Sequence, residues 1–209
     1  MALARGLGSV LRGGETILLS GDLGAGKTTF TRGVAVGLGI SERLVSSPTF
    51  AIINEYDSRP GAPTLVHIDA YRLRGEEELE GTGFERYVRP LSHEARSTYV
   101  LIVEWPERVE RSLAKERAIV RLDHMGGLSR TVHVEIPQPW RTRPGMTELL
   151  EREPTRCRTT GEWVAPNAPA YPFSSEQARM ADLGKWFNEE HRIPGTPGRI
   201  EEEPEPEAT

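Results

Sequence analysis

Residues 21–28 read Gly-Asp-Leu-Gly-Ala-Gly-Lys-Thr, a spacing of residue types that suits phosphate binding. Glycines let backbone N–H groups converge on phosphate oxygens, and a helix that starts directly afterwards adds its positive N-terminal end. Lys27 has the reach for the β- and γ-phosphates, and the Thr28 hydroxyl can coordinate Mg²⁺. We therefore predict that ATP or GTP binds here with magnesium. The predicted nucleotide-binding residues are Gly21, Asp22, Leu23, Gly24, Ala25, Gly26, Lys27, Thr28 and Thr29.

A second set of candidate residues ends two apolar strands farther along the chain. Asp69 comes directly after residues 65–68, and Glu104 directly after residues 99–103. Carboxylates at the carboxyl ends of strands in an α/β sheet face the ligand crevice, where they hold magnesium or orient the attacking water. We expect Asp69 and Glu104 to be catalytic together with Lys27, and Thr28 and Glu104 to bind the metal. For each carboxylate, the alternative is an ordinary turn residue that caps the next helix.

Residues 46–50, Ser-Ser-Pro-Thr-Phe, lie between these two sets and form a candidate switch loop. The hydroxyl of Thr49 could approach the γ-phosphate or the metal, which makes Thr49 a further candidate for nucleotide binding. Ser, Pro and Thr gather in any turn, so the pattern alone favours a functional loop no more than a structural one.

The elements that must position these residues follow from the hydrophobic pattern. Apolar residues at helical spacing predict helices over residues 3–11 and 28–38, and residues 76–87 are predicted as an acidic surface helix. Short apolar runs between them predict strands, the last two as an antiparallel pair. The sequence thus predicts an α/β fold over residues 1–139, a P-loop NTPase-like sheet flanked by helices. The predicted strands are 16–19, 50–56, 64–68, 99–104, 118–122 and 131–136.

The composition changes after residue 139. Residues 140–209 hold nine of the 16 prolines and show no repeating strand pattern, so we expect an irregular, partly disordered C-terminal extension of open role. From about residue 194 it becomes an acidic, Pro-rich tail. One helix is predicted within it, with Ser174 and Gln177 as a capping box. The apolar residues at helical spacing in that helix are Met180, Leu183, Trp186 and Phe187.

Charge and cysteine content limit the class of protein. The net charge is −5, but the last nine residues carry five glutamates, and without them basic and acidic residues balance. Because the rest of the chain has no excess of basic residues, we do not expect it to bind nucleic acid on its own. The single cysteine, Cys157, excludes an internal disulfide and fits a reducing compartment. The longest apolar run is far too short to cross a bilayer, so we expect a cytoplasmic protein without a membrane segment.

Taken together, these segments make the chain similar to the bacterial TsaE (YjeE) family, the ATPase subunit for threonylcarbamoylation of the adenosine beside the anticodon in tRNA. The resemblance covers residues 1 to about 139, in family order and spacing. Family members usually begin with a longer segment beside the adenine, whereas this sequence begins inside the first predicted helix. The matching segments are GDLGAGKTTFTRG at 21–33, SSPTF at 46–50, HIDAYRL at 67–73, EELEGTGFERYV at 77–88 and LIVEWPER at 101–108.

The resemblance implies roles for individual residues. Lys27 and Thr28 would bind phosphate and magnesium, and Glu104 would be a second carboxylate on the magnesium side. Asp69 and Thr49 would belong to the nucleotide-responsive catalytic region, with Trp105 beside it. The family acts by docking on a TsaB–TsaD pair and hydrolysing ATP, so TsaB and TsaD are the implied partners. The tRNA would be held mainly by those partners, in agreement with the balanced charge of the rest of the chain.

Two other classes stay open on the sequence. A small-molecule kinase could use the same phosphate-binding segment with Asp69 as the base for a substrate hydroxyl. It would need an acceptor pocket and usually an Arg-bearing lid, for which no clear segment is present. The other class is a nucleotide switch that binds without useful hydrolysis. The sequence has no Asn-Lys-x-Asp segment for guanine, which argues against a GTPase of the Ras type.

Overall fold

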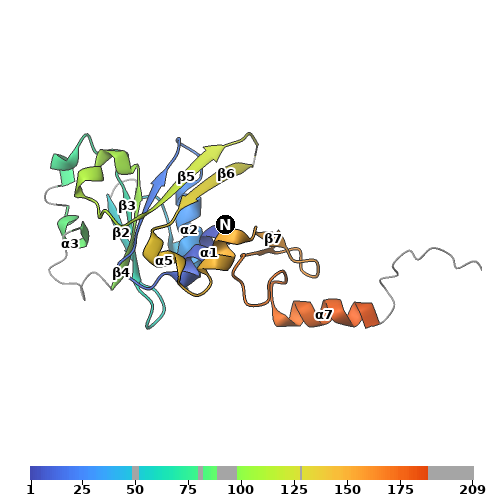
Figure 1. The fold of residues 1–209 in the computed structure, drawn as a ribbon. Helices are drawn as coiled ribbons and strands as arrows, with labels where there is room; N and C mark the ends of the chain where they lie inside the picture. Colours follow the sequence, from blue (N-terminus) through green and yellow to red (C-terminus); the bar gives the residue numbers. More distant parts are fainter. Residues whose placement is uncertain (49–51, 80–81, 89–97, 128, 188–209) are drawn as a thin grey trace, which may run out of the picture.

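The chain builds a six-stranded, mainly parallel sheet, shown in Figure 1. The computed structural model describes residues 1–48, 52–79, 82–88, 98–127 and 129–187. Across the sheet the strand order is β2-β3-β4-β1-β5-β6. The four inner strands run parallel, while β2 and β6 pair antiparallel at the two edges. The strands are β1 (Thr16–Ser20), β2 (Ile53–Tyr56), β3 (Thr64–Asp69), β4 (Tyr99–Glu104), β5 (Ala118–His124) and β6 (Arg130–Glu135).

Both faces of the inner strands are covered, which is why their sequences are apolar almost throughout. Successive side chains of a strand point to opposite faces. In β1, Ile17 and Leu19 enter one hydrophobic cluster and Leu18 enters the other. All three are at most 4% exposed, so this central strand is fixed from both sides. The predicted α/β sheet flanked by helices is confirmed.

Helices α1 (Ala2–Val10) and α2 (Lys27–Gly37) cover the first face of the sheet. They approach one another backbone to backbone, because glycines stand at the crossing. A Cβ on Gly8 would lie 2.2 Å from the carbonyl oxygen of Val34, and one on Gly37 would lie 2.3 Å from that of Arg5. Neither distance is possible for a real side chain, so any larger residue would push the two helices apart.

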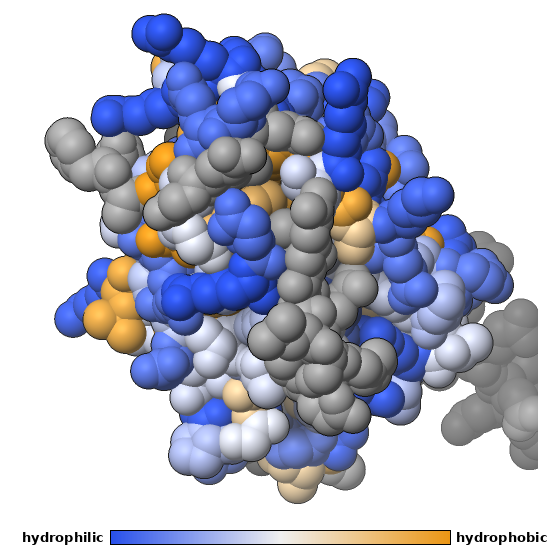
Figure 2. Space-filling view, turned by 90° about the vertical axis from the view of Figure 1, so that its left-hand side faces the viewer, coloured by the Kyte–Doolittle hydropathy of each residue, from blue (hydrophilic) through white to orange (hydrophobic). Residues whose placement is uncertain are grey.

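Shorter helical turns cover the second face, and here one expectation was wrong. Residues 76–87 do not form one helix: a 3₁₀ turn η2 (Glu76–Leu79) is followed by a separate turn of helix, α3 (Glu85–Val88). Gly83, shortly before α3, has a φ of 78°, which lies outside right-handed helical geometry. The coloured residues on this side of the molecule are mainly hydrophilic, with hydrophobic ones only as small separate spots (Figure 2). The remaining 3₁₀ turns are η1 (Glu42–Leu44), η3 (Pro106–Arg108) and η4 (Glu110–Ser112).

The larger hydrophobic cluster continues past residue 139. Two short helices, α5 (Gln138–Arg141) and α6 (Met146–Glu151), place Trp140, Met146 and Leu149 in the same cluster as α1 and α2. Between them, Arg143 forms an ion pair with the buried carboxylate of Glu15, just before β1. The hydrophobic cluster on this face of the sheet therefore reaches past residue 139, where the predicted α/β fold ends, to at least Leu149.

The extension beyond residue 153 contains more regular structure than its sequence indicated. A hairpin of two-residue strands, β7 (Thr155–Arg156) and β8 (Trp163–Val164), precedes helix α7 (Glu176–Phe187). Cys157, Val164 and Ala178 form its small core. The predicted helix is present, but its cap is Ser175, whose Oγ accepts the backbone N–H of Ala178, rather than Ser174.

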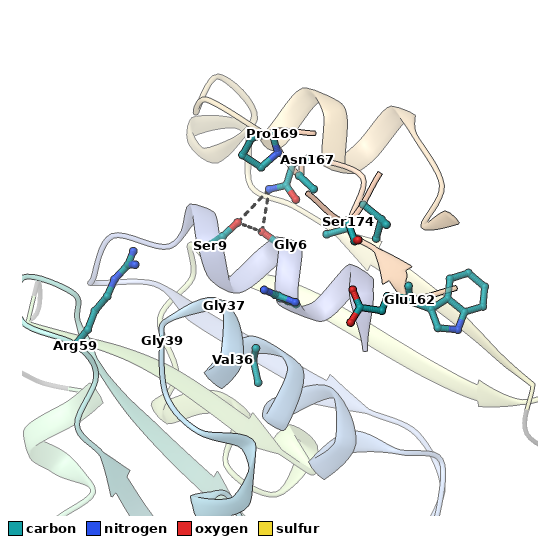
Figure 3. A pocket seen from close by; sticks show the side chains of 15 residues that line it. Gly6, Ser9, Val36, Gly37, Gly39, Arg59, Glu162, Asn167, Pro169 and Ser174 are labelled. Carbon is teal, nitrogen blue, oxygen red and sulfur yellow. Dashed lines mark hydrogen bonds between the residues drawn. The ribbon is translucent and has the colours of Figure 1, made fainter. Parts of the chain in front are cut away.

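The extension is attached to α1 through Asn167, as Figure 3 shows. The Asn167 side-chain amide donates to the carbonyl oxygen of Gly6 at 3.0 Å and to Ser9 Oγ at 3.2 Å. A Cβ on Gly6 would lie only 2.5 Å from Asn167 Oδ1, so the absence of a side chain on Gly6 permits this contact. Helix α1 is consequently held between α2 on one side and the extension on the other.

Candidate nucleotide-binding site

The phosphate-binding segment lies where β1 ends and α2 begins. Gly21 leaves the strand at a φ of 138°, and a Cβ there would lie 2.4 Å from the carbonyl oxygen of Leu122 on the neighbouring β5. Gly26 directly precedes α2 in left-handed geometry, with a φ of 105°. Both positions require the backbone freedom of glycine. The segment therefore bends back over the N-terminal end of α2, as the sequence predicts.

Lys27 is buried at the first position of α2, with its ammonium group aimed into this bend. Nζ donates to the carbonyl oxygens of Gly21 at 2.7 Å and Asp22 at 2.9 Å. Burial lowers the pKa of Lys27. The nearby carboxylates, above all Glu104, oppose this effect but do not cancel it. Nζ also lies 3.9 Å from the centroid of the Trp105 ring, a cation–π distance. A phosphate group would compete with these carbonyls for a cation already in place.

Glu104 meets the first turn of α2 from the end of β4. Its Oε1 accepts hydrogen bonds from Thr28 Oγ1 at 3.0 Å and from His67 Nε2 at 2.9 Å. Glu104 and His67 are both buried. The two residues predicted to bind the metal are thus in direct contact although 76 positions separate them in sequence.

Asp69 lies beside Glu104, because the parallel register of β3 and β4 pairs these two residues. Its Oδ2 accepts a hydrogen bond from Ser47 Oγ at 2.9 Å, and its Oδ1 accepts the backbone N–H of Tyr71 at 3.0 Å. Ser47 thereby ties the candidate switch loop to the carboxyl edge of the sheet. Thr49, the residue predicted to act in that loop, lies outside the described residues.

These residues surround one hollow of about 410 Å³. It collects most of the predicted site: Leu23, Gly24, Gly26, Lys27, Thr28 and Thr29 of the phosphate-binding segment, with Asp69 and Glu104 opposite. Gly21 and Asp22 contribute through their carbonyls to Lys27, and Ala25 is buried behind the segment. Four further side chains at this site were not predicted as site residues: Ser47, His67, Tyr71 and Arg72. The signal that could have found them is their place in segments already singled out, 46–50 for Ser47 and 67–73 for the other three.

Trp105 follows Glu104 in a strained conformation, with a φ of 58° and a ψ of 51°. It is the one non-glycine residue with positive φ within the described ranges. Such geometry persists only where the surroundings hold it. Here the indole packs against the Tyr71 ring, 5.0 Å between centroids, and over the Lys27 ammonium. This backbone conformation places the indole at the hollow, beside Lys27.

The donor atoms in the hollow suit magnesium. Thr28 offers a hydroxyl, and Glu104 and Asp69 offer carboxylates, the hard oxygen ligands that Mg²⁺ prefers. Across the described residues, no group of three or more His, Cys, Asp or Glu side chains is placed to hold a metal ion by itself. Magnesium sites in proteins commonly use one or two carboxylates, completed by substrate phosphates and water.

A second hollow, of about 730 Å³, lies apart from this site at the junction with the extension. Arg59 stands at one side and Glu162 at the other, and none of the predicted site residues lines it (Figure 3).

The centre of the extension is closed by hydrogen bonds around Cys157. The Thr160 and Ser174 hydroxyls lie 3.0 Å apart beside the buried thiol. Burial opposes ionisation of Cys157, but hydrogen bonds from Thr160 and Ser174 outweigh burial and lower its pKa to about 6. Cys157, Thr160 and Ser174 together do not form a structural zinc site, because such a site takes four Cys or His ligands.

A Gly-rich turn, a buried lysine and a hydroxyl–carboxylate contact at the carboxyl edge of a parallel sheet define a P-loop nucleotide-binding protein. The family model described as threonylcarbamoyl adenosine biosynthesis protein TsaE matches residues 1–132. The chain belongs to this family, which confirms the resemblance that its motifs indicated.

Individual relatives agree with the family. The TsaE protein of Streptomyces coelicolor is 41% identical over 126 residues, which are 60% of this chain and 79% of that protein. That of Bacillus subtilis is 40% identical over 131 residues, 63% of this chain and 75% of that protein. The crystal structure of Bacillus subtilis YdiB aligns with a TM-score of 0.52 at 32% identity, covering 71% of this chain and 85% of that one.

A second family model matches a different part of the chain. Residues 154–204 match the family described as DNA gyrase inhibitor YacG. The match begins just after α6 and takes in β7, β8 and α7, and it extends beyond the described residues. The extension is thus similar to a separate family and not only an appendage of the first.

Within the described ranges, no helix has the length and apolar character needed to cross a membrane.

Proposed function

We propose that this chain binds ATP with Mg²⁺ in the hollow at the end of β1 and hydrolyses it as a subunit of the machinery for threonylcarbamoylation of tRNA, acting with TsaB and TsaD. Membership of the TsaE family supports the pathway. The contact between Thr28 Oγ1 and Glu104 Oε1 carries the chemical part of the proposal. It joins the phosphate-binding turn to a carboxylate at the strand edge, which is the pairing that a magnesium–nucleotide site needs.

Each side chain then has a separate task. The Lys27 ammonium leaves the carbonyls of Gly21 and Asp22 to neutralise charge on the β- and γ-phosphates. Thr28 and Glu104 would hold magnesium, which would offset the negative charge that develops on the phosphate oxygens. Asp69 orients the attacking water, since both of its oxygens keep lone pairs free after accepting bonds from Ser47 and Tyr71.

Slow turnover by the isolated chain is expected. Hydrolysis needs water, metal and switch loop fixed together, and a docked partner can supply that positioning. Coupling between two binding events is reciprocal, so ATP should tighten docking on the TsaB–TsaD pair and hydrolysis should loosen it.

The test measures phosphate release by the chain alone and with purified TsaB and TsaD. We expect a slow rate that rises when both partners are added, and partner affinity that is higher with ATP than with ADP. In cells, depletion of the protein should lower threonylcarbamoyladenosine in digested tRNA, measured by mass spectrometry. Unchanged modification after full depletion contradicts the assignment. Phosphate transfer to a small-molecule acceptor that is faster than transfer to water would favour the kinase alternative instead.

We also propose that residues 154–204 bind DNA gyrase. The match to the gyrase-inhibitor family supports this, and so does the surface of the extension. Met180 and Leu183 of α7 are 60% and 47% exposed, and Trp163 of β8 is 56% exposed. Exposed apolar side chains on this small unit are available to contact another protein.

Gyrase binding is tested by pull-down with purified gyrase subunits and by inhibition of supercoiling. We expect capture by the full chain, weaker capture by a Met180→Ser, Leu183→Ser double variant, and none by a chain that ends at Glu153. As a matched control, Met125→Ser changes an equally exposed methionine on the turn between β5 and β6. Equal capture of the full chain and the shortened chain would contradict the proposal.

A further inference from the structure

The imidazole of His67 lies directly behind the Glu104 carboxylate. His67 is in β3 and is 0% exposed, and the register of β3 with β4 places it on the same face of the sheet as Glu104. Its Nε2 is 2.9 Å from Glu104 Oε1. A carboxylate can only accept, so the hydrogen atom in this bond belongs to Nε2.

Two donors therefore converge on one oxygen of Glu104. Thr28 Oγ1 donates to Oε1 from the pocket side, and His67 Nε2 donates to it from inside the protein. Because the Thr28 proton points at Glu104, the lone pairs of that hydroxyl remain available to a cation. Oε2 of Glu104 accepts no hydrogen bond from the part of the chain that the structure describes, so it too remains available. The orientation of both magnesium ligands thus depends on how the carboxylate is held.

We infer that His67 is a positioning residue for magnesium: its Nε2–H fixes the Glu104 carboxylate so that Glu104 and Thr28 present their oxygens to the metal together. The inference rests on the proposed nucleotide site. Groups that hydrogen-bond a metal ligand from behind fix its orientation, and their loss commonly weakens metal binding about 10- to 100-fold.

The other ring nitrogen argues against a purely structural histidine. His67 Nδ1 is buried and finds no hydrogen-bond partner within the described ranges. A buried polar atom without a partner lowers stability, and an apolar side chain of similar size would avoid that cost. The histidine is therefore explained by what Nε2 does and not by its packing.

Substitution of His67 by glutamine and by asparagine distinguishes a positioning role from a purely structural one. The side-chain nitrogen of glutamine occupies about the place of Nε2, whereas that of asparagine occupies about the place of Nδ1 and falls short of Glu104. The affinity for a fluorescent ATP analogue is measured in Mg²⁺ and in EDTA. The affinity in Mg²⁺ divided by the affinity in EDTA is the Mg²⁺-dependent gain. Thermal melting in EDTA reports whether each variant is folded.

We expect His67→Gln to keep most of the Mg²⁺-dependent gain in affinity, and His67→Asn to lose about 10- to 100-fold of it. Affinity in EDTA should be the same for both within about twofold, since the phosphate-binding turn is untouched. His67→Leu should behave like His67→Asn; if it does not fold, the Gln and Asn variants decide alone. A gain retained equally by Gln and Asn overturns the positioning role while leaving the nucleotide site intact. No gain in the unmutated chain overturns the nucleotide site and this inference with it.

Discussion

Lys27 contacts both the phosphate-binding turn and the aromatic side of the site. It donates to two carbonyls of the turn and lies under the Trp105 indole. Because the same ammonium is needed for phosphate, removing it should abolish ligand binding rather than merely slow the reaction.

Lys27→Ala should remove most of the affinity for ATP. In the unmutated chain, ATP at a hundred times its Kd should stabilise the fold by about 2.7 kcal/mol. A thermal-shift titration measures this, with Lys115→Ala as the control, since Lys115 is exposed and away from the hollow. Equal ATP-induced shifts in the Lys27→Ala and unmutated proteins would contradict the assignment.

The two carboxylates should affect turnover more than binding. Glu104→Gln and Asp69→Asn keep the size of each side chain but remove its charge. Nucleotide should still bind through Lys27 and the phosphate-binding turn, although Glu104→Gln should lose part of the gain in affinity that Mg²⁺ provides, and hydrolysis should fall by roughly 10² to 10⁴. Phosphate release in the complex with TsaB and TsaD measures the effect. Asp57→Asn, an exposed aspartate after β2, is the control. Normal hydrolysis by both site variants would mean that the carboxylates only cap turns.

Titration of Cys157 should show how tightly the hairpin of the extension is closed. The chain has no other cysteine, so thiolate absorbance at 240 nm reports this residue alone. We expect a midpoint near pH 6, moving upward in Thr160→Val, which removes one of the two hydroxyl donors. A folded pKa below the unfolded value means that the unfolded chain binds more protons. The stabilisation from Cys157 should therefore be complete above about pH 9, decrease as the pH falls, and be absent below pH 6. A free energy of unfolding that does not change over this range, in the unmutated chain and in Thr160→Val alike, would contradict this.

At the scale of elements, α5 and α6 are the pieces whose position the sequence did not predict. They follow the last strand, yet Trp140, Met146 and Leu149 are 2%, 0% and 4% exposed within the core of the P-loop unit. Chains shortened before and after these two helices show whether the fold needs them.

A chain that ends at Pro139 should be unfolded or strongly destabilised, and one that ends at Glu153 should fold and bind ATP. The first loses three buried side chains, each worth roughly 2–5 kcal/mol, from a domain whose total stability is about 5–15 kcal/mol. Circular dichroism and ATP-induced thermal shifts compare the two. If the shorter chain melts at the same temperature as the longer one, the helices are dispensable.

The strands and the chemistry at their ends could be predicted because their signals are local. Apolar runs located β1, β3 and β4, and acidic residues directly after them located Asp69 and Glu104. His67 could not be found in that way, since nothing near it in sequence shows that its partner is Glu104, 37 positions away. The hairpin of β7 and β8 was missed because two-residue strands are too short to show a period. The helix over 76–87 failed because two glycines interrupt an acidic pattern that otherwise suits a helix.

At the scale of the whole molecule, the contact between Asn167 and α1 joins parts that match two different families. Gly6 makes the contact possible, because a Cβ there would meet Asn167 Oδ1 at 2.5 Å and Leu149 Cδ1 at 2.7 Å. The junction is therefore sensitive to the smallest possible enlargement of one residue.

Gly6→Ala should loosen the extension while leaving the phosphate-binding turn intact. We expect faster cleavage by a protease between residues 152 and 168, and an ATP-induced thermal shift of normal size, because α2 and β1 are not touched by the change. Ser9→Ala is the milder control, since it removes a single acceptor of Asn167. Cleavage of Gly6→Ala at the rate of the unmutated chain would mean that the extension is held mainly by other contacts.

A protein made of two linked units ordinarily reorients as two bodies, each at its own rate. Here α1 approaches α2 closely where glycines stand at the crossing, and Asn167 hydrogen-bonds α1 from the other side. The phosphate-binding turn and the β7–β8 hairpin should therefore tumble together, with the rotational correlation time of one body. Anything captured by the exposed residues of the extension would then be presented to the nucleotide site at a fixed distance and bearing.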